Sequence, residues 1–282
     1  MKYINIFFLI LIILIFLCII IEILNYSKNK PHLYKNLNIK NLSYLDFDYF
    51  KNYHGNEYIY LRYSNNNINE MKKLKIKKIR LIDYCNNLMK NKNWYFKSED
   101  QYDFLSQIGI KKKIIKEFDS FFDKKKYNIQ KKCCSFWMGP KYSTTGWHTD
   151  IDDLSYLYVV KGKKKIQLIS PKYNYAMYEN DIYTHCARWS NVDFKNIDYK
   201  KYPKFKNVKI YKYILNQGDC IYIPKNWWHC VENLEDTIAI TYKIYRVNKL
   251  ILIGIYENIR KKFYSKIDYI DDAKLLLENK IS

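Results

Sequence analysis

The amino-acid sequence predicts a mainly β protein with surrounding helices, preceded by one transmembrane helix. From Cys133 onward, short runs rich in Tyr, Ile and Val alternate with Gly, Pro and Asn turn signals, a texture typical of an antiparallel sandwich or barrel. Before Cys133, strand-like and helix-like segments mix, and an apolar run from Ile4 to Leu24 opens the chain. At 282 residues, the chain is long enough for one large domain or two small ones.

The run from Ile4 to Leu24 has the length of a membrane span. About 20 helical residues at ~1.5 Å each cross a ~30 Å hydrocarbon layer, and only Asn5 and Glu22 interrupt this run, near its ends. A cleaved signal peptide is the alternative, but its apolar core is usually shorter and a small-x-small cleavage site follows it. The sequence that follows here, NYSKNKPH, has no such site. We therefore expect residues 1–27 to form an uncleaved anchor and residues 28–40 a polar, basic linker.

Charges around the apolar run predict its orientation. Lysines follow it at positions 28, 30, 35 and 40, while only Lys2 and the amino terminus precede it. The positive-inside rule then places the large C-terminal part of this single-pass membrane protein in the cytosol. Two glycosylation acceptor patterns, Asn25-Tyr-Ser27 and Asn41-Leu-Ser43, point the other way, but such matches arise by chance in an Asn-rich chain.

The formal charge of +21 suggests an anionic partner such as nucleic acid or anionic lipid. Lys, Asn, Ile and Tyr are abundant together, however, as in proteins of AT-rich genomes, and the lysines are spread along the chain. This pattern favours a solvated surface and leaves a nucleic-acid partner as the alternative. The chain has seven cysteines, an odd number, and no two of them are spaced as C-x-x-C. This favours free thiols in a reducing compartment over a zinc or redox site.

The expected elements follow the chain in order. Residues 41–132 form a mixed α/β part: EYIYLRYS alternates like a strand, whereas IRLIDYCNNLMKN and KKKIIKEFDSFFDKK have the spacing of helices. Residues 133–247 form the β-rich core, with strands expected in CCSFWMGP, GWHTDID, SYLYVVKG, KKIQLISP, YKYILNQGD, CIYIPKNWWHCVEN and DTIAITYKIYRV. Residues 248–282 form an amphipathic helical segment, which either packs on its own domain or pairs two copies in a homodimer.

A candidate metal site begins with His148 and Asp150. Residues two apart on a strand point the same way, so an imidazole and a carboxylate can face one point. His229, in GDCIYIPKNWWHCVEN, opens a later strand and can complete two histidines and one carboxylate, the facial triad typical of non-haem Fe(II) oxygenases. The alternative is a chance surface pair, because H-x-D on its own is a weak signal. The histidines at positions 32, 54 and 185 lack a carboxylate partner in comparable strand geometry.

Lys164 is a candidate anion-binding residue. If VVKGKKKIQLI is one strand, Lys164 shares a face with Val160, Gly162, Ile166 and Leu168, while the polar face opposite meets solvent. A buried ammonium is costly without an anion, and no carboxylate is evident on this face. A dicarboxylate such as 2-oxoglutarate fits, with the hydroxyl of Thr145 as a second donor. The alternative is a lysine that reaches solvent at the strand end.

The ordered motifs resemble those of the JmjC-type, cupin-like 2-oxoglutarate/Fe(II) dioxygenases, in particular the small hydroxylases grouped with the asparaginyl hydroxylase that inhibits hypoxia-inducible factor. The similar pieces are FWMGPKYSTTGWHTD, VVKGKKKIQLISP, ARWSNVDFKNIDYKKYPKF and LNQGDCIYIPKNWWHCVENLEDTIAITYKI. The resemblance covers about residues 40 to 246. It implies a double-stranded β-helix, the jelly-roll core of cupins, with His148, Asp150 and His229 as iron ligands and Lys164 and Thr145 as 2-oxoglutarate-binding residues.

The chain departs from the asparaginyl hydroxylase at two pocket positions. Lys243 stands where that enzyme has Asn on the last core strand, and Leu154 or Ser155 stands where it has Asn after the first ligand histidine. These positions help shape the cosubstrate and substrate pocket, so the resemblance does not identify the substrate. The N-terminal anchor is also unlike the soluble members.

The resemblance implies an enzyme that uses Fe(II), 2-oxoglutarate and O2, most simply to hydroxylate a side chain of a protein substrate. N-methyl-lysine demethylation and hydroxylation of an RNA base are alternatives within the same chemistry. An alternative of another class is a catalytically silent, membrane-tethered cupin that serves as a binding module. The complete set of His148, Asp150 and His229 favours the enzyme, because a scaffold has no need of all three.

Overall fold

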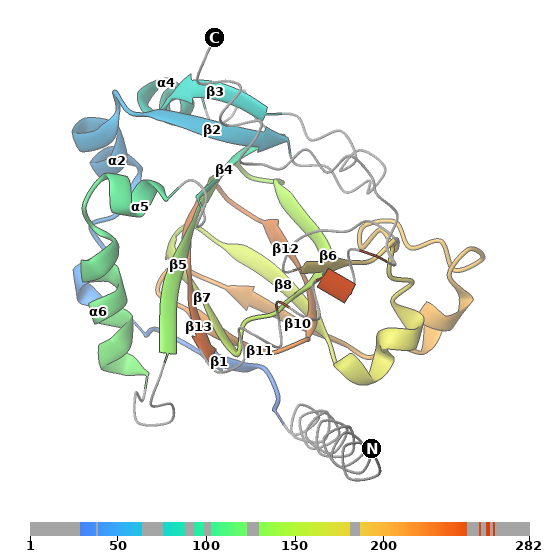
Figure 1. Cartoon of the computed structure of the whole chain (residues 1–282). Coiled ribbons are helices and arrows are strands. Elements are labelled where there is room, and N and C mark those ends of the chain that lie inside the picture. Colours follow the sequence, from blue (N-terminus) through green and yellow to red (C-terminus); the bar gives the residue numbers. More distant parts are fainter. Residues whose placement is uncertain are drawn as a thin grey trace, which may run out of the picture.

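The computed structural model describes residues 29–37, 39–63, 76–87, 93–98, 103–122, 130–180 and 187–246, together with residues 254, 258, 259 and 262. Two antiparallel β-sheets form the centre of the molecule (Figure 1). The eight-stranded sheet has the order β1-β11-β7-β13-β5-β4-β2-β3, and the five-stranded sheet has the order β10-β8-β12-β6-β9.

The strands of the eight-stranded sheet are β1 (His32–Tyr34), β11 (Cys220–Pro224), β7 (Leu154–Lys161), β13 (Thr237–Arg246), β5 (Gln130–Gly139), β4 (Trp94–Ser98), β2 (Tyr58–Tyr63) and β3 (Ile76–Arg80). Those of the five-stranded sheet are β10 (Ile210–Leu215), β8 (Lys164–Ile169), β12 (Trp228–Asn233), β6 (Thr144–Asp150) and β9 (Ala187–Trp189). The mainly β expectation is therefore confirmed, and the predicted core strands are present.

The eight-stranded sheet has two different faces because side chains alternate along each strand. On β13, Ile238, Ile240 and Tyr242 pack in the large core under the helices, whereas Ala239 belongs to a second core between the two sheets. Leu157 of β7 and Ile166 of β8 meet in that second core. The space between the sheets is thus filled largely by apolar side chains, with buried polar side chains such as His148 and Lys243 beside them.

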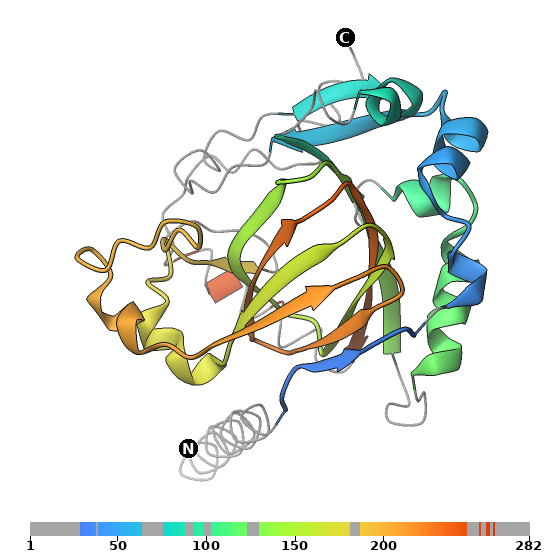
Figure 2. The ribbon, with the colours of Figure 1, turned by 180° about the vertical axis from the view of Figure 1, so that it is seen from behind.

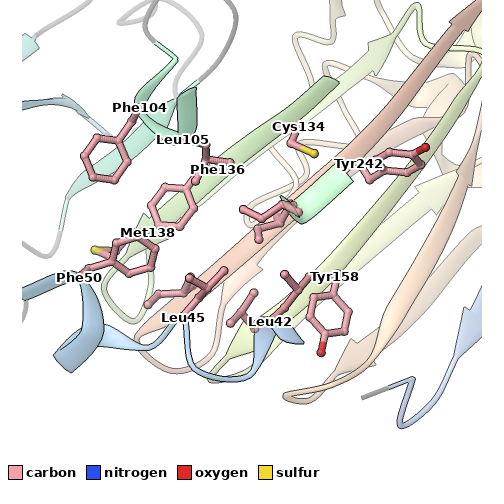
Figure 3. Packing of buried hydrophobic residues seen from close by; sticks show 14 of the residues in the cluster. Leu42, Leu45, Phe50, Phe104, Leu105, Cys134, Phe136, Met138, Tyr158 and Tyr242 are labelled. Carbon is pink, nitrogen blue, oxygen red and sulfur yellow. The ribbon is translucent and has the colours of Figure 1, made fainter. Parts of the chain in front are cut away.

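Helices cover the outer face of the eight-stranded sheet (Figure 1). They are α2 (Phe47–His54), α4 (Leu81–Asn86), α5 (Phe104–Gln107) and α6 (Lys111–Phe121), with the short turn η1 (Lys40–Leu42). Asp46 caps α2 by accepting a hydrogen bond from the amide of Tyr49 at 2.8 Å. Figure 3 shows Phe50 and Phe104 from the helices packed toward Phe136 of β5, with 4.9 Å between the rings of Phe50 and Phe136.

The connection between β8 and β10 forms a separate layer on the side of the two sheets away from the helices (Figure 2). It contains η3 (Pro171–Ala176), β9 and η4 (Pro203–Asn207), and it buries its own apolar cluster, which includes Met177, Phe194 and Phe205. Because β9 pairs with β6, opposite His148 and Asp150, this connection borders the candidate metal site.

Two sequence expectations are corrected by the strands. Residues 32–34, within the expected linker, form β1 and pair with β11 as an edge strand, which backbone hydrogen bonds achieve without an alternating apolar pattern. VVKGKKKIQLI is two strands in different sheets and not one: β7 ends at Lys161 and β8 begins at Lys164. Gly162, with φ of 80°, makes the turn between them, and Gln167, expected to meet solvent, is buried.

The predicted membrane anchor lies outside the described residues. Among the helices that the structure does describe, none combines the length and the apolar composition that crossing a membrane requires. In the C-terminal segment, residues 254, 258, 259 and 262 are described and are helical.

Candidate metal centre

His148, Asp150 and His229 come together between the two sheets. One ligand atom from each lies within 4.8 Å of the others. His148 Nε2 is 3.9 Å from Asp150 Oδ1, and His229 Nε2 is 3.7 Å from Asp150 Oδ2. The strand register explains the meeting, because His148 on β6 pairs directly with His229 on β12. These are two imidazoles and a carboxylate at a spacing that one metal ion can bridge.

Both histidines are oriented by backbone carbonyls. Nδ1 of His148 lies 2.9 Å from the oxygen of Gly146, and Nδ1 of His229 lies 3.1 Å from the oxygen of Trp227. A carbonyl oxygen can only accept a hydrogen bond, so Nδ1 carries the proton in each ring. Nε2 is left with its lone pair toward the centre, as a metal ligand requires.

The protonation states also suit a metal. Burial, assisted by His229, lowers the pKa of His148 to about 3, and burial lowers the pKa of His229. Burial alone raises the pKa of Asp150, but the neighbouring Lys243 and the two histidines outweigh it and hold that pKa below its usual value. At neutral pH the site therefore presents two neutral imidazoles and one carboxylate.

Lys243 stands beside this centre. Its ammonium lies 3.7 Å from Asp150 Oδ2 and 3.2 Å from Asp152 Oδ2. Both Lys243 and Asp152 are buried, and burial raises the pKa of Asp152 to about 6. The sequence marks Lys243 as a departure in the pocket, but it gives no role to Asp152, whose two-residue spacing from Asp150 is the signal that could have found it.

Lys164 is buried farther along the same sheet. Its ammonium donates a hydrogen bond to Asn233 Oδ1 at 2.6 Å, and burial lowers its pKa to about 7. On the paired strands β8 and β12, Lys164 stands opposite Asn233, and Leu168 stands opposite His229. Directly paired residues share a face, so the ammonium and the metal centre lie on one face with Ile166 and Val231 between them.

Thr145 is half-buried on β6, opposite Val231 of β12. No hydrogen bond joins its hydroxyl to another of the described residues. The structure thus brings the three predicted metal ligands together and places Lys164 on β8 and Thr145 on β6, the two strands that flank β12 in the same sheet.

Sequence reasoning missed Trp189. Its ring stacks on that of His148, with 4.7 Å between centroids and 20° between planes. Its indole nitrogen is buried and has no hydrogen-bond partner in the described part of the chain. The stretch ARWSN resembles a loop in sequence, and only the pairing of β9 with β6 shows that it forms a wall of the site.

Comparison with protein families agrees with the fold. The family model described as "Cupin-like domain" matches residues 27–245, which is most of the chain. The chain belongs to the cupin-like domain family. The predicted resemblance to JmjC-type cupins is also confirmed, because several similar curated proteins carry JmjC names.

Three relatives illustrate the relation. JmjC domain-containing protein D of Dictyostelium discoideum is 29% identical over 220 residues, covering 69% of this chain and 46% of that protein. Jumonji C domain-containing protein 5 of Drosophila melanogaster is 30% identical over 106 residues, covering 38% and 26%. Lysine-specific demethylase JMJ31 of Arabidopsis thaliana is 30% identical over 110 residues, covering 38% and 20%. The matched part spans less than half the length of each relative.

Proposed function

We propose that this cupin-like protein is an Fe(II)- and 2-oxoglutarate-dependent dioxygenase that hydroxylates a side chain of a protein substrate. The observation that carries the proposal is the convergence of His148, Asp150 and His229 at one buried point, within 4.8 Å and in the protonation states that a metal requires. In this proposal the three side chains are the iron ligands.

The donor set fits Fe(II). Two imidazole nitrogens and one carboxylate oxygen are the ligands of non-haem ferrous sites that keep open positions for other molecules. The carbonyls of Gly146 and Trp227 fix the two rings before a metal arrives. A fixed ligand set loses little conformational entropy on binding, which favours affinity.

Lys164 supports 2-oxoglutarate as the cosubstrate. A dicarboxylate can place its keto acid at the metal and its distal carboxylate at the ammonium, with its methylenes against Ile166 and Val231. The distal carboxylate supplies the anion that the ammonium of Lys164 lacks among the described residues, and the hydroxyl of Thr145 is a second donor in the proposal.

Bound there, Fe(II) with 2-oxoglutarate and O2 would supply the oxidising chemistry that converts a C–H bond to C–OH, with succinate and CO2 as the other products. The chain's own residues hold and orient these molecules. Lys243 contributes a positive charge beside Asp150, and the apolar side chains between the sheets, such as Leu157 and Leu168, keep water from the interior.

Demethylation of N-methyl-lysine is the second candidate. The observation that favours it is the similarity to the Arabidopsis protein named as a lysine-specific demethylase. Both reactions begin with hydroxylation of a C–H bond, so they share the proposed metal centre and differ in the substrate. We further propose that residues 1–27 anchor the enzyme in a membrane with its catalytic part in the cytosol.

The test compares wild-type protein with His148→Ala. Supplied with Fe(II), 2-oxoglutarate and a cellular protein extract, the wild type is expected to form succinate and to add one oxygen to target peptides detected by mass spectrometry. His148→Ala removes a ligand and should do neither. Loss of a methylene from target lysines would favour the demethylase, and equal succinate formation by both proteins would refute the metal assignment.

A further inference from the structure

Lys164 meets an amide where a buried lysine would ordinarily meet a carboxylate. Its ammonium donates to Asn233 Oδ1 at 2.6 Å, and the two residues are 5% and 4% exposed. Within the described part of the chain, no carboxylate lies within ion-pair distance of it. The interior therefore fixes the place of the ammonium and supplies no carboxylate to pair with it.

Asn233 can present only its oxygen to Lys164. Its Nδ2 donates to Ser143 Oγ at 2.7 Å and lies 3.2 Å from the carbonyl oxygens of Gly139 and Pro140. Those carbonyls can only accept, so the NH2 group faces them and the oxygen faces the ammonium. Ser143 Oγ itself donates to the Pro140 oxygen at 2.8 Å, which leaves its lone pairs for the amide.

The turn between β5 and β6 holds Asn233 by its backbone as well. The amide of Asn233 donates to the oxygen of Ser143 at 2.9 Å, and the amide of Tyr142 donates to the oxygen of Asn233 at 2.8 Å. A Cβ added to Gly139 would stand 3.1 Å from Asn233 Nδ2 and 2.8 Å from Ser143 Oγ. The side chain is therefore enclosed in a close-packed cradle and has little freedom to turn.

We propose that Asn233 is a positioning residue that holds the Lys164 ammonium in place for the distal carboxylate of the cosubstrate and adds no carboxylate that would compete for it. This inference rests on the proposed function, since it takes 2-oxoglutarate as the ligand. The chemical class it selects is a 2-oxo acid with a second carboxylate at a fixed distance from the metal.

Holding the Lys164 ammonium without competing with the ligand requires a neutral hydrogen-bond acceptor. A carboxylate at position 233 would form a buried ion pair with Lys164 and compete with the ligand for the same ammonium. An apolar residue would leave the ammonium without a partner and free to change rotamer. The amide does neither, and its register opposite Lys164, four residues after His229 on β12, sets the distance to the metal centre.

The competing explanation is that Asn233 only ties the turn between β5 and β6 to β12. That role would affect stability and the binding of every ligand alike. A positioning role instead affects only the affinity that the distal carboxylate of 2-oxoglutarate adds. The two are separated by comparing 2-oxoglutarate with 2-oxopentanoate, which has the same carbon chain and keto acid but ends in a methyl group.

The experiment measures dissociation constants of both keto acids for the full-length protein with Fe(II) under anaerobic conditions. In wild type, 2-oxoglutarate should bind at least about tenfold more tightly, the effect of one hydrogen-bonded charge contact. Asn233→Asp should reduce that ratio to about threefold or less, because the new carboxylate neutralises the ammonium. Ser143→Ala removes one hydrogen bond of the Asn233 side-chain amide and leaves the amide itself unchanged. It should lower the affinity ratio of the two keto acids roughly two- to fivefold.

The matched control is Thr237→Val. Thr237 pairs with Gly139 at the same cradle, is fully buried, and has a hydroxyl without a hydrogen-bond partner among the described residues. The affinity ratio of the two keto acids in Thr237→Val should therefore match that of the wild type. A wild-type ratio in both folded Asn233→Asp and Ser143→Ala would overturn the positioning role and leave the proposed function intact. Failure of wild type to bind either keto acid would overturn both.

Discussion

At the residue scale, burial of Lys164 makes its charge responsive to pH. Burial lowers its pKa from 10.5 to about 7, while the unfolded chain keeps the ordinary value. Between these values the unfolded state holds a proton that the folded state has released. The free energy of unfolding therefore rises with pH across this window. Below pH 7 both states hold the proton, so Lys164 adds no pH dependence there.

We predict that Lys164→Met removes this pH dependence. For the protein without metal or cosubstrate, the difference in unfolding free energy between wild type and variant should change by on the order of a few kcal/mol from pH 7 to pH 10. Urea titrations at several pH values measure it, and other groups that titrate in both proteins cancel in the difference. Parallel curves for the two proteins would contradict the lowered pKa of Lys164 in the folded state.

The sequence predicts the metal centre better than it predicts its surroundings. Spacing on a strand places His148 beside Asp150, and the W-W-H motif points to His229, so the structure was needed only to bring them together. Asn233 and Trp189 act through pairing between strands distant in sequence, of β12 with β8 and of β9 with β6. Such a register cannot be derived from one strand's own pattern.

At the element scale, the turn at Gly162 carries the chain from one sheet to the other. A Cβ at this position would lie 2.1 Å from the carbonyl oxygen of Asp236, and the φ of 80° disfavours side chains. The sequence pattern hides this break, because lysines on both sides continue the alternation expected of one strand. Lys164 follows the turn directly, so the turn also places the ammonium.

Gly162→Ala should lower the free energy of unfolding by at least about 2 kcal/mol, through backbone strain and the clash with Asp236. The control is Gly146→Ala, where an added Cβ meets nothing within 4 Å and φ is not positive. Chemical denaturation of both variants measures the effect. Equal stability of Gly162→Ala and wild type would show that the turn has another conformation.

At the scale of the whole molecule, one layer of helices covers the eight-stranded sheet, and the connection carrying β9 lies on the opposite side (Figures 1 and 2). The mixed texture of residues 41–132 indicated the helices. The layer formed by residues 171–180 and 187–209 was less accessible to sequence reasoning, because these residues form few regular elements and pack around their own cluster, which includes Phe194 and Phe205.

The membrane anchor stays a prediction from the sequence. Leu14→Arg places a charge at the middle of the apolar run, at a cost of about 2.5–3.5 kcal/mol on insertion scales. We expect the full-length wild type to stay in the membrane fraction after alkaline extraction and a substantial share of the variant to be released. Complete release of the wild type would contradict the anchor.

Iron binding by the whole chain is the decisive property of the proposed metal centre. Equilibrium dialysis against Fe(II) without oxygen should show stoichiometric binding by the wild type and loss of that binding in His229→Ala, because His229 joins the other two ligands from a strand distant in sequence. Retention of iron by His229→Ala with wild-type affinity would contradict the proposed centre.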